Sequence, residues 1–121
     1  MLQILIADPD AATRRALTLL LRRKLGTDNI AEVEDMETLI RVLADAPPDL
    51  LLLDWQLYGS PAAETCRLLR KAYPQLKIVL LSVDAEDATA AREAGADFIH
   101  KGASPDELIA TLTPLLRTDK E

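Results

Sequence analysis

Short apolar runs alternate with longer segments of helical spacing along the whole chain. The apolar runs are too short to form helices and indicate buried strands, at residues 2–7, 29–33, 49–53, 77–82 and 97–100. Leu50 to Leu53 and Ile78 to Leu81 are apolar at every position, which is typical of parallel strands covered on both faces. We expect these two runs to be central strands.

The segments between the runs carry apolar residues at steps of three and four, which predicts amphipathic helices. The expected helices cover 13–25 with a stop at Gly26, 36–43 after Asp35, a segment that begins at Ser60 and Pro61, about 84–95, and a segment that begins at Ser104. Ser104 and Glu107 have the spacing of a capping box around Pro105. Pro114 should kink or end this last helix, because proline lacks the backbone N–H that a helix interior requires.

Five strands that alternate with five helices predict a doubly wound α/β fold, with a five-stranded parallel sheet and helices on both of its faces. The chain has no internal repeats, low-complexity tracts or long linkers. We therefore expect a single domain over residues 1–117, followed by a frayed tail at 118–121.

Polar side chains follow four of the predicted strands at the point where each strand ends. They are Asp8 and Asp10 after the first strand, Asp54 after the third, Ser82 at the end of the fourth and Lys101 after the fifth. In open parallel sheets, ligands bind beyond the carboxyl ends of the strands. The sequence therefore predicts one site at this edge, built from acids, a hydroxyl and a lysine.

Composition narrows the possible partners of this site. The 121 residues suit one domain with one core, and a net charge of −6 with no basic block argues against direct binding to nucleic acid. Cys66 is the single cysteine, which excludes a disulfide framework and fits a reducing, cytoplasmic location. No apolar stretch approaches the roughly 20 residues that a membrane helix needs, so no membrane association is expected.

Four stretches in this order, ILIADPD, PDLLLLDWQL, VLLSVDA and AGADFIHKGASPDEL, resemble the receiver domain of bacterial response regulators over essentially the whole chain. The resemblance implies the flavodoxin-like strand order 2-1-3-4-5. It also implies a phosphoacceptor switch in two-component signal transduction, in which Asp54 receives a phosphoryl group from a sensor histidine kinase or a phosphotransfer protein. Such a domain is not an enzyme beyond phosphorylating itself from small donors and dephosphorylating itself.

The same resemblance assigns further roles. Lys101 would neutralise the phosphoryl group, Ser82 would donate its hydroxyl to a phosphoryl oxygen, and Phe98 would turn between two rotamers as a second switch residue. Gln56 and Asp84 would tune the rate of dephosphorylation. An output domain or partner protein, or a second copy in a homodimer, would bind the fourth helix, fifth strand and fifth helix.

The cofactor implied is Mg²⁺, and here the chain departs from the family. Receiver domains normally place two adjacent acids after the first strand, whereas this chain has Pro9 in the second position. Asp8, Asp54 and the backbone carbonyl of Gln56 would still bind the metal, with Asp10 as a further, water-mediated ligand. We expect weaker Mg²⁺ binding and slower phosphorylation than in a typical member.

Three alternatives remain at this point. Asp8 is also suited to cap the first helix, with Pro9 at its first position. A second alternative is a pseudo-receiver, a binding module of the same fold that phosphorylation does not regulate. The third is a phosphatase resembling haloacid dehalogenases, with Asp8 as nucleophile and Asp10 as general acid and base, although that motif normally continues with Gly-Thr and this one continues with Ala11 and Ala12.

Overall fold

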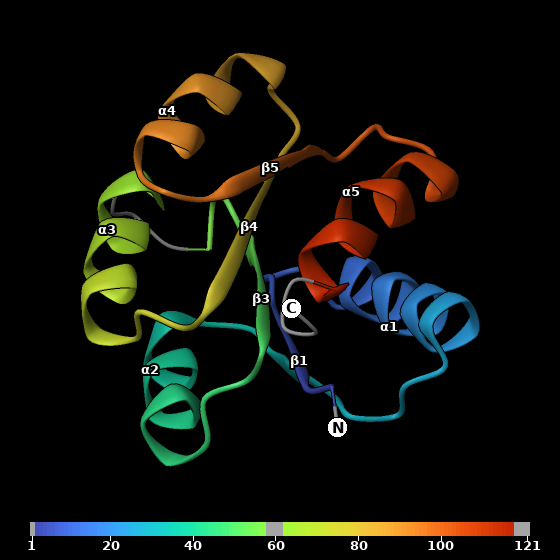
Figure 1. Ribbon diagram of the computed structural model, residues 1–121, viewed down its shortest axis with the longest axis horizontal. Coiled ribbons are helices and arrows are strands. Elements are labelled where there is room, and N and C mark those ends of the chain that lie inside the picture. Colours follow the sequence, from blue (N-terminus) through green and yellow to red (C-terminus); the bar gives the residue numbers. More distant parts are fainter. Residues whose placement is uncertain (1, 58–61, 118–121) are drawn as a thin grey trace.

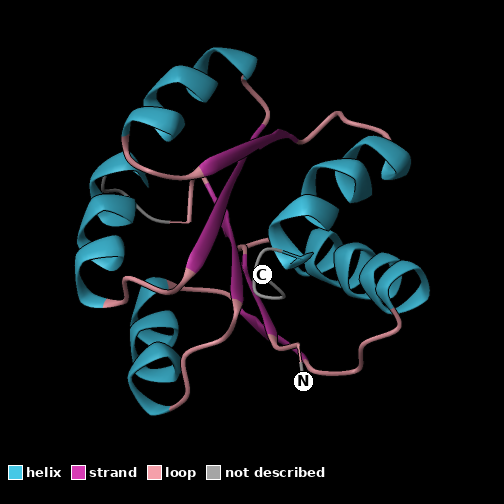
Figure 2. Ribbon diagram, in the orientation of Figure 1, coloured by secondary structure: helices cyan, strands magenta, loops and turns pink. Residues whose placement is uncertain are grey.

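The computed structural model describes residues 2–57 and 62–117, which form a central parallel sheet with helices on both faces (Figures 1 and 2). The strands are β1 (Ile4–Ala7), β2 (Ile30–Val33), β3 (Leu50–Asp54), β4 (Lys77–Ser82) and β5 (Asp97–His100). The helices are α1 (Ala11–Leu25), α2 (Met36–Asp45), α3 (Ala62–Ala72), α4 (Ala88–Glu93) and α5 (Pro105–Arg117), with a 3₁₀ turn, η1 (Ala85–Asp87), directly before α4.

The sheet has the order β2-β1-β3-β4-β5, and every neighbouring pair is parallel. This confirms the doubly wound, flavodoxin-like prediction. Ile4 of β1 pairs with Leu50 of β3, and Asp54 at the end of β3 pairs with Leu81 of β4. The register therefore brings the carboxyl ends of β1, β3, β4 and β5 to one edge of the sheet.

Two hydrophobic clusters cover the two faces of the sheet, because successive strand residues point to opposite sides. One cluster packs alternate strand residues such as Leu51 and Leu53 against α2, α3 and α4. The other packs residues such as Leu50 and Leu52 against α1 and α5. This arrangement explains why the central strands are apolar at every position.

Local signals place most helix ends as predicted. Gly26 ends α1 in the left-handed region, at φ 70°, and Asp35 caps α2 by accepting a hydrogen bond from the Thr38 N–H. Ser104 and Glu107 form the capping box of α5, at 2.8 and 3.2 Å. The start of the third helix, predicted at Ser60 and Pro61, lies outside the described residues, as does the predicted tail at 118–121.

Pro114 was predicted to kink or end its helix; it does not end it, because α5 continues through this residue to Arg117. Leu115 and Leu116 beyond the proline pack against the hydrophobic cluster on this face of the sheet. Burial of apolar side chains favours the helical path and offsets the hydrogen bond that proline cannot make.

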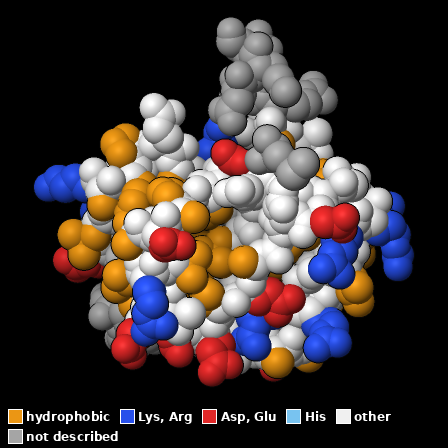
Figure 3. Space-filling model, turned by 90° about the horizontal axis from the view of Figure 1, so that it is seen from below, with side chains coloured by type: hydrophobic (Ala, Val, Ile, Leu, Met, Phe, Trp, Pro, Cys, Tyr) orange, Lys and Arg blue, Asp and Glu red, His pale blue; other side chains and the backbone are white. Residues whose placement is uncertain are grey.

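The surface in Figure 3 carries Lys and Arg interspersed with Asp and Glu around a group of hydrophobic side chains. On this face the basic residues do not gather into a patch. Across the two described ranges, no helix combines the length and the apolar character that crossing a bilayer demands.

Candidate functional site

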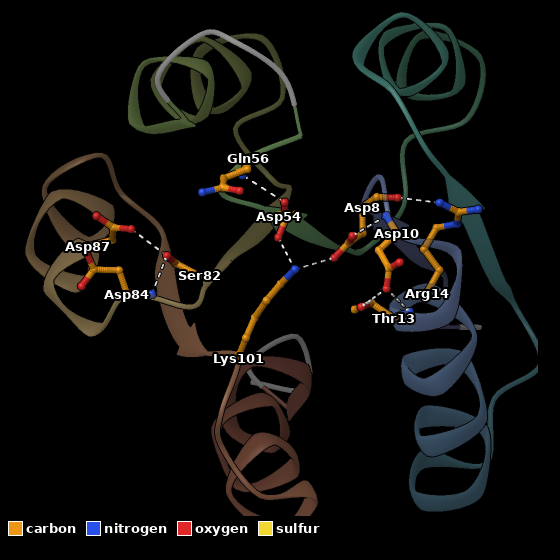
Figure 4. Close-up of polar contacts among 10 residues, drawn as sticks. All are labelled: Asp8, Asp10, Thr13, Arg14, Asp54, Gln56, Ser82, Asp84, Asp87 and Lys101. Atoms are coloured by element: carbon orange, nitrogen blue, oxygen red, sulfur yellow. Dashed lines mark hydrogen bonds and ion pairs between the residues drawn. The ribbon is translucent and has the colours of Figure 1, made fainter.

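The predicted polar residues meet at the carboxyl edge of the sheet, around a cavity of about 180 Å³ (Figure 4). The cavity is lined by Asp8, Pro9, Asp10, Asp54, Trp55, Gln56, Ser82, Val83 and Lys101. These residues come from four different strand ends, so the sheet alone brings them together. Glu34 and Asp35, which follow the edge strand β2, are outside this lining.

Lys101 is the centre of the site. Its ammonium group lies 2.9 Å from Oδ2 of Asp8 and also forms an ion pair with Oδ1 of Asp54. The Asp8 and Asp54 side chains are only 3 % and 6 % exposed, so both charges are held away from solvent. A buried carboxylate needs such a partner, since burial without one is strongly unfavourable.

The environment also keeps Lys101 charged. Burial alone would lower the pKa of its ammonium group, but the hydrogen bonds that it donates to Asp54 and Asp8, together with their negative charges, raise the pKa above its ordinary value. The Lys101 side chain is therefore positively charged at neutral pH, next to the carboxylates of Asp8 and Asp54.

Arg14 holds the main chain beside this pair. Its guanidinium donates to the Asp8 carbonyl at 2.6 Å and forms ion pairs with Glu32 at 3.3 Å and Glu34 at 3.8 Å. Arg14 thus ties the end of β1 to the edge strand β2. Sequence reasoning missed this residue, because no spacing within the helix indicates a contact between Arg14 and the end of β1.

Asp10 and not Asp8 caps the first helix. Oδ2 of Asp10 accepts hydrogen bonds from the Thr13 N–H at 2.9 Å and from its hydroxyl at 2.6 Å, which lowers the pKa of the Asp10 carboxyl. Pro9 precedes the cap, so it does not occupy the first helical position. The capping alternative for Asp8 is therefore wrong, because Lys101 and the Asp10 N–H take its two carboxylate oxygens.

The donors at this edge suit Mg²⁺, which binds oxygen ligands and retains several waters. Asp8 and Asp54 supply two buried carboxylates on the same cavity, while Pro9 supplies no side-chain oxygen. Asp54 Oδ2 also accepts the Gln56 N–H at 3.0 Å, which orients the carboxylate. Within 2–57 and 62–117 there is no cluster of three or more His, Cys, Asp or Glu of the kind that holds a metal. The set fits a water-rich Mg²⁺ site with few protein ligands.

Ser82 lies at the site, but its hydroxyl points elsewhere. Its Oγ donates to Oδ2 of Asp87 at 2.6 Å and accepts the Asp84 N–H at 3.0 Å (Figure 4). The side chain of Asp84 caps η1 through the Glu86 N–H. Phe98, the other expected switch residue, is half-buried against the cluster beneath α2, α3 and α4. Nothing in the sequence spacing indicated Asp87 as the partner of Ser82.

The fold and the site together define a flavodoxin-like domain with an acid pair and a lysine at the carboxyl edge of its sheet. The family model of the response regulator receiver domain matches residues 4–113. The chain belongs to this family. This family assignment takes the place of the alternative that the chain is a phosphatase resembling haloacid dehalogenases.

Individual relatives agree with the family. The chain is 34 % identical over 119 residues to the phosphate regulon transcriptional regulatory protein PhoB of Pseudomonas aeruginosa, and this match covers 94 % of the chain and 51 % of PhoB. It is 36 % identical over 120 residues to the transcriptional regulatory protein ResD of Bacillus subtilis, covering 95 % of the chain and 48 % of ResD. The chain thus spans about half the length of these curated relatives.

A solved structure supports the fold. The signal receiver domain of a DNA-binding response regulator from Colwellia psychrerythraea 34H superposes with a TM-score of 0.87, covering 98 % of this chain and 100 % of that one. The identity is 18 %, so this likeness bears on the fold alone.

Proposed function

We propose that this domain is a phosphoacceptor switch in which Asp54 receives a phosphoryl group in a Mg²⁺-dependent reaction. The observation that carries the proposal is the ion pairing of Lys101 with both Asp54 and Asp8 at the edge of the sheet. This pairing places one cation beside the acceptor carboxylate and beside the acid that would bind the metal. The phosphoryl donor would be a sensor histidine kinase or a phosphotransfer protein.

In the reaction, a carboxylate oxygen of Asp54 forms a bond to phosphorus as the bond between phosphorus and the donor atom breaks, and the donor keeps that electron pair. Lys101 neutralises charge on the transferring oxygens and on the new acyl phosphate. Asp8, Asp54 and the backbone carbonyl of Gln56 would hold Mg²⁺, which supplies further charge neutralisation when bound. The domain itself is not an enzyme in this proposal, and Gln56 and Asp84 would tune how fast the acyl phosphate hydrolyses.

The output of the switch would act through the surface formed by α4, β5 and α5. Ser82 lies one residue before the loop to η1 and α4, and Phe98 lies on β5, so both adjoin that surface. An output domain, a partner protein or a second copy would bind there, in the cytoplasm. The greater length of PhoB and ResD supports an output that lies beyond the matched region.

A second candidate, a pseudo-receiver, is favoured by one observation. Pro9 provides no ligand oxygen, and Oδ2 of the nearby Asp10 is occupied by Thr13. If the remaining donors hold Mg²⁺ too weakly, the fold would serve as a binding module without phosphorylation.

Intact mass after incubation with acetyl phosphate separates the two candidates. We expect a gain of one phosphoryl group that requires Mg²⁺ and disappears in Asp54→Asn. Folding of that variant is checked by circular dichroism. No gain in the folded wild type at any Mg²⁺ concentration would overturn the switch and support the pseudo-receiver.

A further inference from the structure

The hydroxyl of Ser82 has a single proton to donate, and Asp87 accepts it. The Oγ to Oδ2 distance of 2.6 Å is that of a charge-assisted hydrogen bond, in which a hydroxyl donates to a carboxylate. The Asp84 N–H, at 3.0 Å, occupies an acceptor position of the same oxygen. In this state Ser82 has no proton left for a phosphoryl group on Asp54.

Asp87 is placed to make this bond and not a helix cap. It is the residue directly before α4, in the capping position, yet within the described chain its carboxylate makes no capping bond to that helix. Ser82 is 4 % exposed, so its hydroxyl would be left without a strong acceptor if Asp87 were absent. The carboxylate thus fixes the direction of a buried hydroxyl that lines the site.

We propose that Asp87 is a positioning residue that holds the Ser82 hydroxyl away from Asp54 and competes for it with the phosphoryl group. This inference rests on the proposed function of the site. A phosphoryl group on Asp54 can accept the Ser82 hydroxyl only when the bond to Asp87 breaks. The same event releases a carboxylate at the start of α4, which belongs to the proposed output surface. Asp87 therefore sets the balance between the resting and phosphorylated states and connects Ser82 to α4.

The test measures the affinity for beryllium trifluoride, which takes the place of a phosphoryl group on a carboxylate, in the presence of Mg²⁺. Trp55 is the single tryptophan of the chain and lines the same cavity, so its emission reports binding, and fluorine NMR of the bound group gives a second readout. In Asp87→Ala we expect binding to tighten about tenfold or more, the effect of removing one competing hydrogen bond to a charged group. Asp87→Asn should give a smaller gain, because a neutral amide oxygen is a weaker acceptor.

Two controls separate this role from a simple change of charge. Glu86→Gln removes the same charge from the preceding, exposed residue of the turn and should leave the affinity near that of the wild type. In a Ser82→Ala background, Asp87→Ala should no longer tighten binding, because no hydroxyl remains to be released. Equal tightening with and without the Ser82 hydroxyl would overturn the inference and indicate electrostatic repulsion alone.

The outcomes also distinguish this inference from the proposed function. A wild type that binds the analogue with an affinity that Asp87→Ala leaves unchanged would overturn the role of Asp87 only. If the wild type fails to bind the analogue while Asp87→Ala binds it, the result would support the inference and show that Asp87 restrains Ser82 strongly. Absence of binding in both folded proteins would overturn the phosphoacceptor function and this inference together.

Discussion

The Nδ1 atom of His100 accepts a hydrogen bond from the backbone N–H of Gly102, with 3.1 Å between the two nitrogens. Nδ1 is therefore unprotonated, so Nε2 carries the hydrogen and donates to the Val83 carbonyl at 2.9 Å. The ring connects the loop after β4 to the loop that carries Lys101. Proline at position 102 would have no N–H and could not make this contact.

Gly102→Ala should weaken this connection. A Cβ at this position would lie 2.8 Å from Cε1 and 3.0 Å from Nδ1 of His100, so the ring would have to move away from Val83. We expect a loss of about 1 kcal/mol in the free energy of unfolding, measured by urea denaturation, and almost no further loss in a His100→Ala background. A loss of equal size in both backgrounds would place the cause in the backbone of residue 102 instead.

Lys101→Met should destabilise the fold, because it leaves Asp8 and Asp54 buried beside each other with no cation. We expect the free energy of unfolding to fall by about 1–3 kcal/mol at neutral pH, less than for a fully buried pair because the lysine is partly exposed. Millimolar Mg²⁺ should restore part of this loss, which urea denaturation with and without the metal would measure. If Mg²⁺ stabilises Lys101→Met no more than the wild type, the two carboxylates do not share a metal.

The same variant has a defined dependence on pH. The pKa of Lys101 is raised in the folded protein, so its contribution to stability is complete below its unfolded pKa of about 10.4 and is lost as the pH rises through the folded pKa. The difference in unfolding free energy between wild type and Lys101→Met should therefore stay constant from neutral pH to about pH 10 and shrink above it. A difference that changes across the neutral range would point to another group.

Sequence patterns were sufficient for the architecture, because hydrophobic periodicity and helix caps are local signals. Runs such as Leu50 to Leu53 identify strands buried on both faces, and parallel strands bring their carboxyl ends to one edge. For this reason the sequence alone predicts that Asp8, Asp54 and Lys101 lie together. Pro114 does not end α5, because the packing of Leu115 and Leu116, which no local signal indicates, favours continuation of the helix.

Side-chain direction within the site could not be obtained in the same way. Ser82 was expected at the site from its place at the end of β4, but its hydroxyl chooses among acceptors that only the folded loop presents. Asp87, His100 and Arg14 all act through contacts between loops or between a helix and a strand. The sequence spacing carries no period that would indicate such contacts.

Asp10 offers a test of capping against metal binding. Asp10→Ala should lower the melting temperature by removing the oxygen that accepts from Thr13, whereas Asp10→Ser should keep most of the stability because serine also caps helices. The pKa of Asp10 is lowered, so its contribution is present above its ordinary pKa and lost as the pH falls through the folded value. Asp10→Ser should lack this acid dependence in thermal melts. A large loss of Mg²⁺ affinity in Asp10→Ser would instead identify Asp10 as a ligand.

Pro9→Asp should strengthen Mg²⁺ binding, because it restores a carboxylate beside Asp8 on the wall of the cavity. We expect the affinity to increase about tenfold or more, since each added oxygen ligand and negative charge favours a hard divalent cation. Emission of Trp55 during a Mg²⁺ titration would measure the change.

Pro9→Ala is the matched control, because it removes the ring without adding an oxygen and should leave the affinity close to that of the wild type. If Pro9→Ala gains as much as Pro9→Asp, the proline ring obstructs the metal and a missing ligand is not the cause. If neither variant gains Mg²⁺ affinity, Asp8 and Asp54 already supply all the side-chain ligands that the metal needs. The departure at Pro9 then has no consequence for the switch.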